Sequence, residues 1–447
     1  MEQPYHSKSI PELYGDLLGT EPNLLTNYVP HNSAEQKRYF LAGDNHIPDH
    51  HYDKLDSFNF VGAQARISLI GQRIITHPDL NPKYAVSYQG FIDDYRQKTR
   101  LMELAHDYKD SVASREKAKI RQDYMKLNIQ LYGEPYEDTY RSLLQDKLNQ
   151  IDRKRLSQSA SQLRDELFGL VDYVPTKQRY ERFTPSKATV KWMHLVAKNL
   201  YGDMLSHAPD QAKFSVAEVR DIFAEILEQE FGEAAAGWTV DIEPAKSINV
   251  KSAQRQIVLP ERRVDMTYRK LQDLIVHEIG VHFLRSVMGA ETDLLPLQNG
   301  LNRYYAFEEG LGMVMQQALK GKFSESGVEA YITAGLAYYD HKDFRDTFEV
   351  KWRLSALRSV KRSVEITENA IAKAKNRAYS RVMRSMRGTD ELPWFKDLAY
   401  YNGSIDVWRH LESIKGDDIK LMSILTGKID PTNIEHLRVL MDIKAVG

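Results

Sequence analysis

The stretch Leu274–Phe283 reads LIVHEIGVHF and places two histidines and a glutamate inside an otherwise apolar run. A run of this length and apolar content predicts a buried helix. Neutral imidazole is the commonest metal ligand in proteins, and a carboxylate beside two imidazoles is the group set of a zinc hydrolase. The stretch therefore predicts a metal-binding helix in which His277, Glu278 and His282 carry the chemistry.

The spacing of this motif is H-E-x-x-x-H, one residue longer than the familiar H-E-x-x-H of zinc peptidases. Five residues on a regular α-helix rotate a side chain by about 140°, so His277 and His282 would diverge from a common ion. They converge only if the turn is widened, as in a π-type bulge. Gly280 lies between them and permits a distortion at low steric cost. We expect a widened turn at residues 279–281; the alternative is two unrelated histidines in a core helix, each bonded to backbone.

A second motif lies at Phe307–Gly312, which reads FEEGLG and opens another helical pattern. Together the two motifs resemble the QEGLA-motif family of bacterial proteins, which includes the microtubule-associated tyrosine carboxypeptidases. This chain departs from QEGLA at the first and last positions, where it has Glu308 and Gly312. Arg384–Gly388 and Phe395–Gly403 are similar to the family's RG and KDLxYxxG segments.

The resemblance implies a zinc site, with one Zn²⁺ per chain held by His277, His282 and Glu309 and with water in the open fourth position. Glu278 is then available as the general base that activates this water. Glu308 points about 100° away from Glu309 on a helix, so only one of them should face the metal. Glu309 is the expected ligand because it matches the family's Glu before Gly-Leu.

The resemblance further implies a metallocarboxypeptidase that removes a C-terminal residue, Tyr or Glu, from the acidic tail of a protein or peptide. Such an enzyme needs a fixed cation for the terminal carboxylate. We expect this cation from the segment Arg381–Arg387, with Arg381 and Arg384 as the leading candidates, or from the basic residues before the metal helix, Lys251 above all. Candidates for stabilising the oxyanion are Tyr304, Tyr305, Tyr400 and Arg384. The other basic residues before the metal helix are Arg255, Arg262 and Arg263.

The composition excludes several classes of protein. Lys and Arg number 61 against 62 Asp and Glu, so the chain has no overall charge suited to nucleic acid or to an anionic membrane. There is no cysteine, which excludes thiolate ligands and disulfides. The start Met1–His6 lacks the features of a secretory signal, and no window approaches the twenty or so apolar residues of a membrane span. We expect a soluble, cytoplasmic protein with no nucleic-acid or membrane partner.

The pattern along the chain predicts an α+β fold that is predominantly helical. Residues 1–185 are expected to form a loop-rich entry segment, up to about residue 60, and a helical N-terminal region. Residues 186–447 are expected to form a zincin-like catalytic domain, after a linker at residues 172–185. Strand signals at residues 239–242, 248–250 and 256–259 predict a small sheet beside the HExxxH helix.

Two clusters of charged residues leave alternatives open. The segment Asp44–Asp53 contains three aspartates and three histidines, but it is polar and Pro-containing, so a solvated loop is favoured over a metal site. The segment Lys351–Arg387 contains eleven Lys or Arg and two Asp or Glu. It is either a set of solvated helix faces or a positive wall near the site, suited to an acidic tail.

Two other functions share the same residues. Two histidines and a carboxylate also form the ligand set of non-haem Fe(II) oxygenases, but such an enzyme has no use for Glu278 as a base. The second alternative is a non-catalytic, regulatory protein that keeps the metal for structure. Structural zinc sites are usually closed by four protein ligands, and the motifs supply three.

Overall fold

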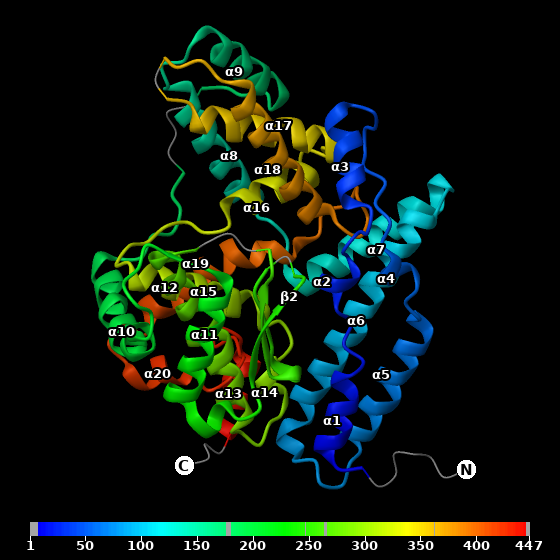
Figure 1. Ribbon diagram of the computed structural model, residues 1–447. Coiled ribbons are helices and arrows are strands. Elements are labelled where there is room, and N and C mark those ends of the chain that lie inside the picture. The colour runs from blue at the N-terminus through cyan, green and yellow to red at the C-terminus, as the bar shows by residue number, and fades with distance from the viewer. Residues whose placement is uncertain (1–7, 176–179, 246, 263–265, 362, 444–447) are drawn as a thin grey trace.

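Helices build most of the molecule and two small sheets complete it, so the prediction of a predominantly helical α+β fold is confirmed (Figure 1). The elements gather into three groups: a lower group around the HExxxH motif, an N-terminal group beside it, and an upper group above both. The computed structural model describes residues 8–175, 180–245, 247–262, 266–361 and 363–443. The expectations for Met1–His6 and for Arg263, and part of that for the linker at 172–185, lie outside these residues.

The N-terminal group is more helical than its turn-rich sequence predicts. Four short helices lie in the expected entry segment, and α1 begins with a capping box between Ser9 and Glu12. Two buried clusters, one around Ile70 and Phe91 and the other around Tyr28 and Leu101, hold the group together. Its helices are α1 (Ile10–Leu18), α2 (Leu24–Asn27), α3 (Ser33–Ala42), α4 (Asp53–Asp56), α5 (Phe60–Ile75), α6 (Ala85–Asp110) and α7 (Ser114–Tyr132), with a 3₁₀ turn η1 (Pro82–Tyr84).

The upper group combines helices from both sides of the predicted boundary near residue 185. Tyr140 and Leu148 belong to one buried cluster with Leu336 and Phe348, which are far apart from them in sequence. The division into 1–185 and 186–447 therefore stays a prediction, since one core crosses it. The helices of this group are α8 (Glu137–Asp152), α9 (Gln158–Leu170), α16 (Val328–Tyr338), α17 (Phe344–Ser359) and α18 (Glu368–Met386).

The lower group surrounds the HExxxH segment. α11 begins with the capping box of Ser215 and Glu218 that its sequence pattern indicates. The helices are α10 (Lys187–Ser206), α11 (Val216–Ile226), α12 (Tyr268–Leu274), α13 (Leu284–Ala290), α14 (Pro296–Asn299), α15 (Tyr305–Leu319), α19 (Ala399–Ser413), α20 (Asp418–Ser423) and α21 (Ile434–Asp442). Shorter helical segments are η2 (Leu227–Phe231), η3 (Gly232–Ala235), η4 (Ser252–Gln254), η5 (Ile275–Phe283) and η6 (Phe395–Leu398).

The predicted strands form one three-stranded sheet of order β2-β4-β3. β2 (Thr239–Glu243) pairs in parallel with the central β4 (Gln256–Pro260), and β3 (Asn249–Lys251) pairs antiparallel at the edge. β3 lies against the HExxxH segment, so the sheet stands beside it as expected. A second, two-stranded sheet joins β1 (Lys213–Phe214) to β5 (Met266–Thr267), directly before α12.

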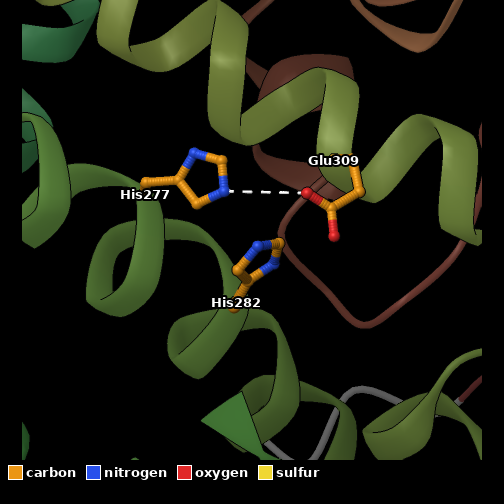
Figure 2. Close-up of side chains that lie close together, drawn as sticks. All are labelled: His277, His282 and Glu309. Atoms are coloured by element: carbon orange, nitrogen blue, oxygen red, sulfur yellow. Dashed lines mark ion pairs between the residues drawn. The ribbon is translucent and has the colours of Figure 1, made fainter. Parts of the chain in front are cut away.

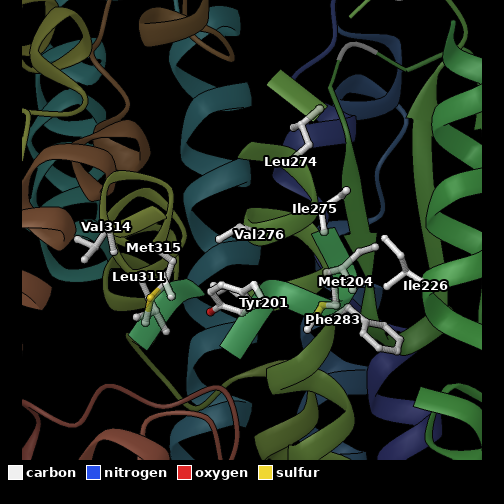
Figure 3. Close-up of a cluster of buried hydrophobic side chains, with 14 of the residues drawn as sticks. Tyr201, Met204, Ile226, Leu274, Ile275, Val276, Phe283, Leu311, Val314 and Met315 are labelled. Carbon is white, nitrogen blue, oxygen red and sulfur yellow. The ribbon is translucent and has the colours of Figure 1, made fainter. Parts of the chain in front are cut away.

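The HExxxH segment runs through the centre of the lower core as a continuous helix made of α12, η5 and α13. Its apolar residues pack in one buried cluster with side chains of α10, α11 and α15, shown in Figure 3. Gly280 has no positive φ. Instead, a Cβ at this position would lie 2.6 Å from the ring of Tyr201, so the glycine is needed for the close approach of α10.

A buried polar cluster joins the N-terminal group to the turn after α18. The ring of His50 is fully buried, and its Nδ1 lies 2.8 Å from Asp390 while its Nε2 lies 3.0 Å from the Tyr379 hydroxyl. Tyr52 and Lys109 also donate hydrogen bonds to the Asp390 carboxylate. The expectation of a solvated loop at Asp44–Asp53 is therefore wrong for His50, because its partner lies 340 residues away in sequence.

The upper group contains a partly buried ion-pair cluster centred on Glu329. Its carboxylate accepts from Lys351 at 2.7 Å and from Arg358, and Arg381 lies 3.6 Å away. Lys351 is buried, so Glu329 is the charge that makes its burial possible. Burial opposes ionisation of Glu329, but Lys351 and the two arginines outweigh it and lower its pKa to about 2.

Replacing Glu329 with Gln should destabilise the protein by about 3–5 kcal/mol near pH 7, because it leaves the Lys351 charge buried without a partner. Since the folded pKa is below the unfolded value, the stabilisation is present above pH ~4.5 and is lost as pH falls toward 2. Urea unfolding of both proteins between pH 7 and pH 3 measures this. Glu137→Gln, which removes an exposed pair with Arg141, should cost at most about 0.5 kcal/mol. Equal losses for the two variants would contradict the prediction.

Candidate metal centre

The two histidines of HEIGVH lie on one face because η5 is a π-helix over Ile275–Phe283. In this wider turn i and i+5 are neighbours, and the rings of His277 and His282 have centroids 4.8 Å apart at an interplanar angle of 80°. The predicted widening at residues 279–281 is confirmed. α12 leads regularly into this segment, with the side chain of Thr267 capping the amide of Lys270.

Glu309 approaches the histidines from α15, which packs against η5 (Figure 2). Its Oε2 lies 3.8 Å from Nε2 of His277, and one ligand atom from each of the three residues lies within 4.8 Å of the others. All three side chains are largely buried. The helix can come this close because Gly312 faces the His277 ring, where a Cβ would lie 2.6 Å from the ring atoms. The departure from the family's Ala at this position thus accommodates the imidazole.

Glu308 turns away from this centre and binds the back of His282. Its Oε1 lies 2.8 Å from Nδ1 of His282, and its other oxygen accepts from Arg285. Arg285 is fully buried and also donates to the carbonyl oxygens of Ile424 and Ile429. A carboxylate that accepts Nδ1–H leaves Nε2 free to bind a metal. Sequence reasoning missed this role, although Arg285 follows His282 by three residues and shares its helix side.

The charges around the histidines shift their pKa values in opposite directions. Burial, followed by the neighbouring His282, lowers the pKa of His277 and keeps this ring neutral, as a metal ligand must be. Burial works against the charged form of His282 as well, but the hydrogen bond and charge of Glu308 outweigh it and raise its pKa. Glu308 itself is buried, yet Arg285 and His282 lower its pKa to about 2, so it is a carboxylate.

Glu278 is a potential catalytic group beside these residues. It follows His277 on η5 and is partly exposed, unlike the apolar residues around it. It is close enough for its charge to raise the pKa values of both histidines, against the lowering effect of burial. The arrangement brings together two imidazoles, one inward carboxylate and one accessible carboxylate, which is a donor set for a divalent metal with a neighbouring base.

The KDLxYxxG-like segment reaches the same place because α15 and α19 cross at two glycines. A Cβ on Gly310 or on Gly403 would overlap the backbone of the other helix. This crossing places Tyr400 beside Glu309, whose charge, followed by burial, raises the pKa of that phenol. Lys396, in η6, is buried and donates to the hydroxyl of Tyr305. Burial, followed by the charge of Glu309, raises the pKa of the Tyr305 phenol.

The predicted substrate-binding residues lie in three different places. Arg384 donates to both oxygens of Asp397, at 2.5 and 2.9 Å, and to the Tyr400 hydroxyl at 3.3 Å, so these two lie together. Arg381 faces Glu329 in the upper group. Lys251 lies on the edge strand β3, with its ammonium 2.8 Å from Gln256 and 3.3 Å from Glu243. Within the basic segment Lys351–Arg387, five of the cations are paired with acids, so the segment is not a continuous free positive wall: Lys351, Arg353, Arg358, Arg381 and Arg384.

The sequence of residues 103–350 matches the family described as microtubule-associated tyrosine carboxypeptidase. This match covers more than half of the chain and contains the whole HEIGVH and EEGLG region. The chain belongs to the microtubule-associated tyrosine carboxypeptidase family. As a member of a carboxypeptidase family it is a hydrolase. The matched residues end before Arg384. The position of the RG and KDLxYxxG segments beside the metal centre is therefore supported by the structure and not by the family match.

No curated protein matches this chain. Among the residues that the structure describes, no helix combines the length and the apolar composition needed to cross a bilayer.

Proposed function

We propose that this member of the family is a zinc-dependent carboxypeptidase that removes the last residue, Tyr or Glu, from an acidic protein tail. The observation that carries the proposal is the convergence of His277, His282 and Glu309 beside Glu278. The family name adds that its members act on a terminal tyrosine and associate with microtubules. On this view the partner is a protein with an acidic, free C-terminus.

The residues fit a catalytic zinc ion. Ligand atoms about 2.0–2.2 Å from a tetrahedral zinc lie roughly 3.4 Å from one another, and the pair His277–Glu309 is at 3.8 Å. His282 has its Nδ1 occupied by Glu308, so Nε2 is the nitrogen left for the ion. Two imidazoles and one carboxylate leave a fourth position open for water, which favours a catalytic over a structural role.

A zinc ion bound here would lower the pKa of a water toward 7 and polarise the scissile carbonyl. Glu278 accepts the proton of the attacking water and passes it to the leaving amine. Glu308 holds the His282 ring in one tautomer and orientation, and Arg285 fixes Glu308. Tyr305 and Tyr400, both beside Glu309, are the phenols available to hydrogen-bond the developing oxyanion.

The presence of Glu278 favours hydrolysis over the Fe(II) oxygenase alternative, because an oxygenase does not need a base beside its first histidine. The open fourth position argues against a metal kept only for structure. Metal analysis separates these alternatives: we expect about one zinc ion per chain and no iron dependence. Iron-dependent turnover, or tightly bound metal without any hydrolytic activity, would support the alternatives instead.

We expect the purified, zinc-loaded protein to shorten peptides that end in a run of Glu, or in Glu followed by Tyr, by one residue. Mass spectrometry of the products measures this. The same peptides amidated at the C-terminus should be cut at least tenfold more slowly, since they lack the charge-assisted hydrogen bonds of a carboxylate. Equal cleavage of both forms, or cleavage inside the peptide, would make the protein an endopeptidase.

A further inference from the structure

The cation that binds the substrate's terminal carboxylate has to lie next to the metal centre. One residue spans at most about 3.6 Å of extended chain, so the carboxylate of the last residue lies close to the carbonyl that is cut. Arg381 does not meet this requirement, because it belongs to the Glu329 cluster of the upper group. Arg384 lies nearer, but Asp397 already occupies its guanidinium through two hydrogen bonds.

Arg387 is the arginine of this region whose charge is not paired. It follows the last turn of α18, and burial lowers the pKa of its guanidinium. Its Nε is buried without a hydrogen-bond partner, and the described residues place no carboxylate within ion-pair distance of it. Its guanidinium stacks 4.7 Å from the ring centroid of Trp394, which holds the side chain in place but leaves its donors unused. Arg387 as a whole is only partly buried, but its buried Nε has no partner, so an anion that reaches this guanidinium would satisfy it.

Lys396 lies beside Arg387 and connects it to the metal centre. Its charge acts on Glu309 and on Arg387, while its ammonium donates to Tyr305 and lies 4.0 Å from the centroid of that ring. Tyr305 lies within electrostatic range of both Glu309 and Arg387. The side chains of Tyr305 and Lys396 therefore connect the metal ligand Glu309 to the unpaired guanidinium of Arg387.

The charges in this neighbourhood do not balance. Three cations interact electrostatically here: Arg384, Arg387 and Lys396. Apart from the metal ligand Glu309, the carboxylate that interacts with all three is that of Asp397. A bound anion would complete the set. An α-carboxylate has the planar, two-oxygen geometry that a guanidinium fork binds bidentately.

We propose that Arg387, together with Lys396, forms the subsite that binds the α-carboxylate of the substrate's last residue, in place of Arg384 and Arg381. Arg384 and Asp397 act as a positioning pair that fixes η6, and with it Lys396, beside α18. The assignment rests on the proposed carboxypeptidase function, because it gives that function its requirement for a free C-terminus.

Peptide binding to zinc-loaded protein carrying Glu278→Gln, measured by calorimetry, tests the subsite without turnover. The probes are one peptide ending in Glu-Glu-Tyr as the free acid and the same peptide as the C-terminal amide. This parent protein should bind the free acid at least tenfold more tightly than the amide. Adding Arg387→Gln should reduce this preference to within about twofold, and adding Arg387→Lys should leave an intermediate preference because the charge stays while the fork is lost.

Adding Arg381→Gln is the matched control, since it removes an arginine six residues earlier, on α18, and it should keep the full preference. The amide affinity, the zinc content and the melting temperature report whether Arg387→Gln is folded. If the preference survives Arg387→Gln, or if the parent shows none, the subsite is overturned. If wild type cuts free-acid peptides while the preference survives Arg387→Gln, the subsite fails and the proposed function stands. If the preference depends on Arg387 but the wild type cuts no peptide, the subsite stands and the proposed function fails.

Discussion

Replacing Glu278 with Gln should lower kcat by on the order of 10³-fold while the zinc content stays at the wild-type level. The amide of Gln has nearly the same shape but cannot take a proton from water, and Glu278 is not one of the three residues that converge as ligands. Steady-state kinetics on a free-acid peptide, together with metal analysis of the same preparation, measures both quantities.

The exposed Glu291, at the end of α13, provides the control for this experiment. Glu291→Gln makes the same chemical change outside the site and should keep the wild-type kcat. Full activity of Glu278→Gln would exclude it as the base. Loss of zinc together with activity would instead make Glu278 a ligand.

The second large effect is the difference in zinc affinity between variants of two neighbouring residues, Glu308 and Glu309. Glu308→Gln should weaken zinc binding by about 10–100-fold, which is typical when the group that orients a ligating histidine is changed. Glu309→Gln should weaken it by well over 100-fold, because it removes a ligand rather than the support of one. Competition with a chelator at pH 7 measures both affinities, and the two variants serve as controls for each other.

The order of the zinc affinities of these two variants decides which glutamate is the ligand. If Glu308→Gln loses the metal while Glu309→Gln retains it, the assignment of the ligand is reversed. The loss of affinity caused by Glu308→Gln should also be smaller at pH 6 than at pH 8. Glu308 raises the pKa of His282, so protons compete less for this ring in the variant than in the wild type.

The sequence was sufficient for the part of the site that depends on local geometry. HEIGVH and EEGLG name the three converging residues, and the i,i+5 spacing requires the wide turn that η5 shows. The strands before the motif follow from β-branched runs that end at Pro260. In each of these cases the evidence lies within one segment of a few residues.

What the sequence did not predict depends on contacts between distant segments. Arg384 and Arg387 look equivalent in sequence, and only the position of η6 decides that Arg384 is paired with Asp397. His50 sits in a polar stretch and is buried by a partner at the other end of the chain. The direction of Glu308 follows from helix geometry, but its partner Arg285 becomes evident only once the π-helix sets the position of His282.

The buried pair of His50 and Asp390 also determines when the site can form during synthesis. The turn that follows Arg387 is held by residues of the N-terminal group, which leave the ribosome first and wait for a partner made 340 residues later. Contacts of such long sequence separation form late in folding. The buried cluster around the HEIGVH helix likewise contains Trp408 and Ile424, which are made after Arg387. The metal-binding side and the cationic side of the site therefore both wait for the C-terminal part of the chain, so a ribosome-bound fragment that ends before residue 390 should neither hold the metal nor recognise a protein end.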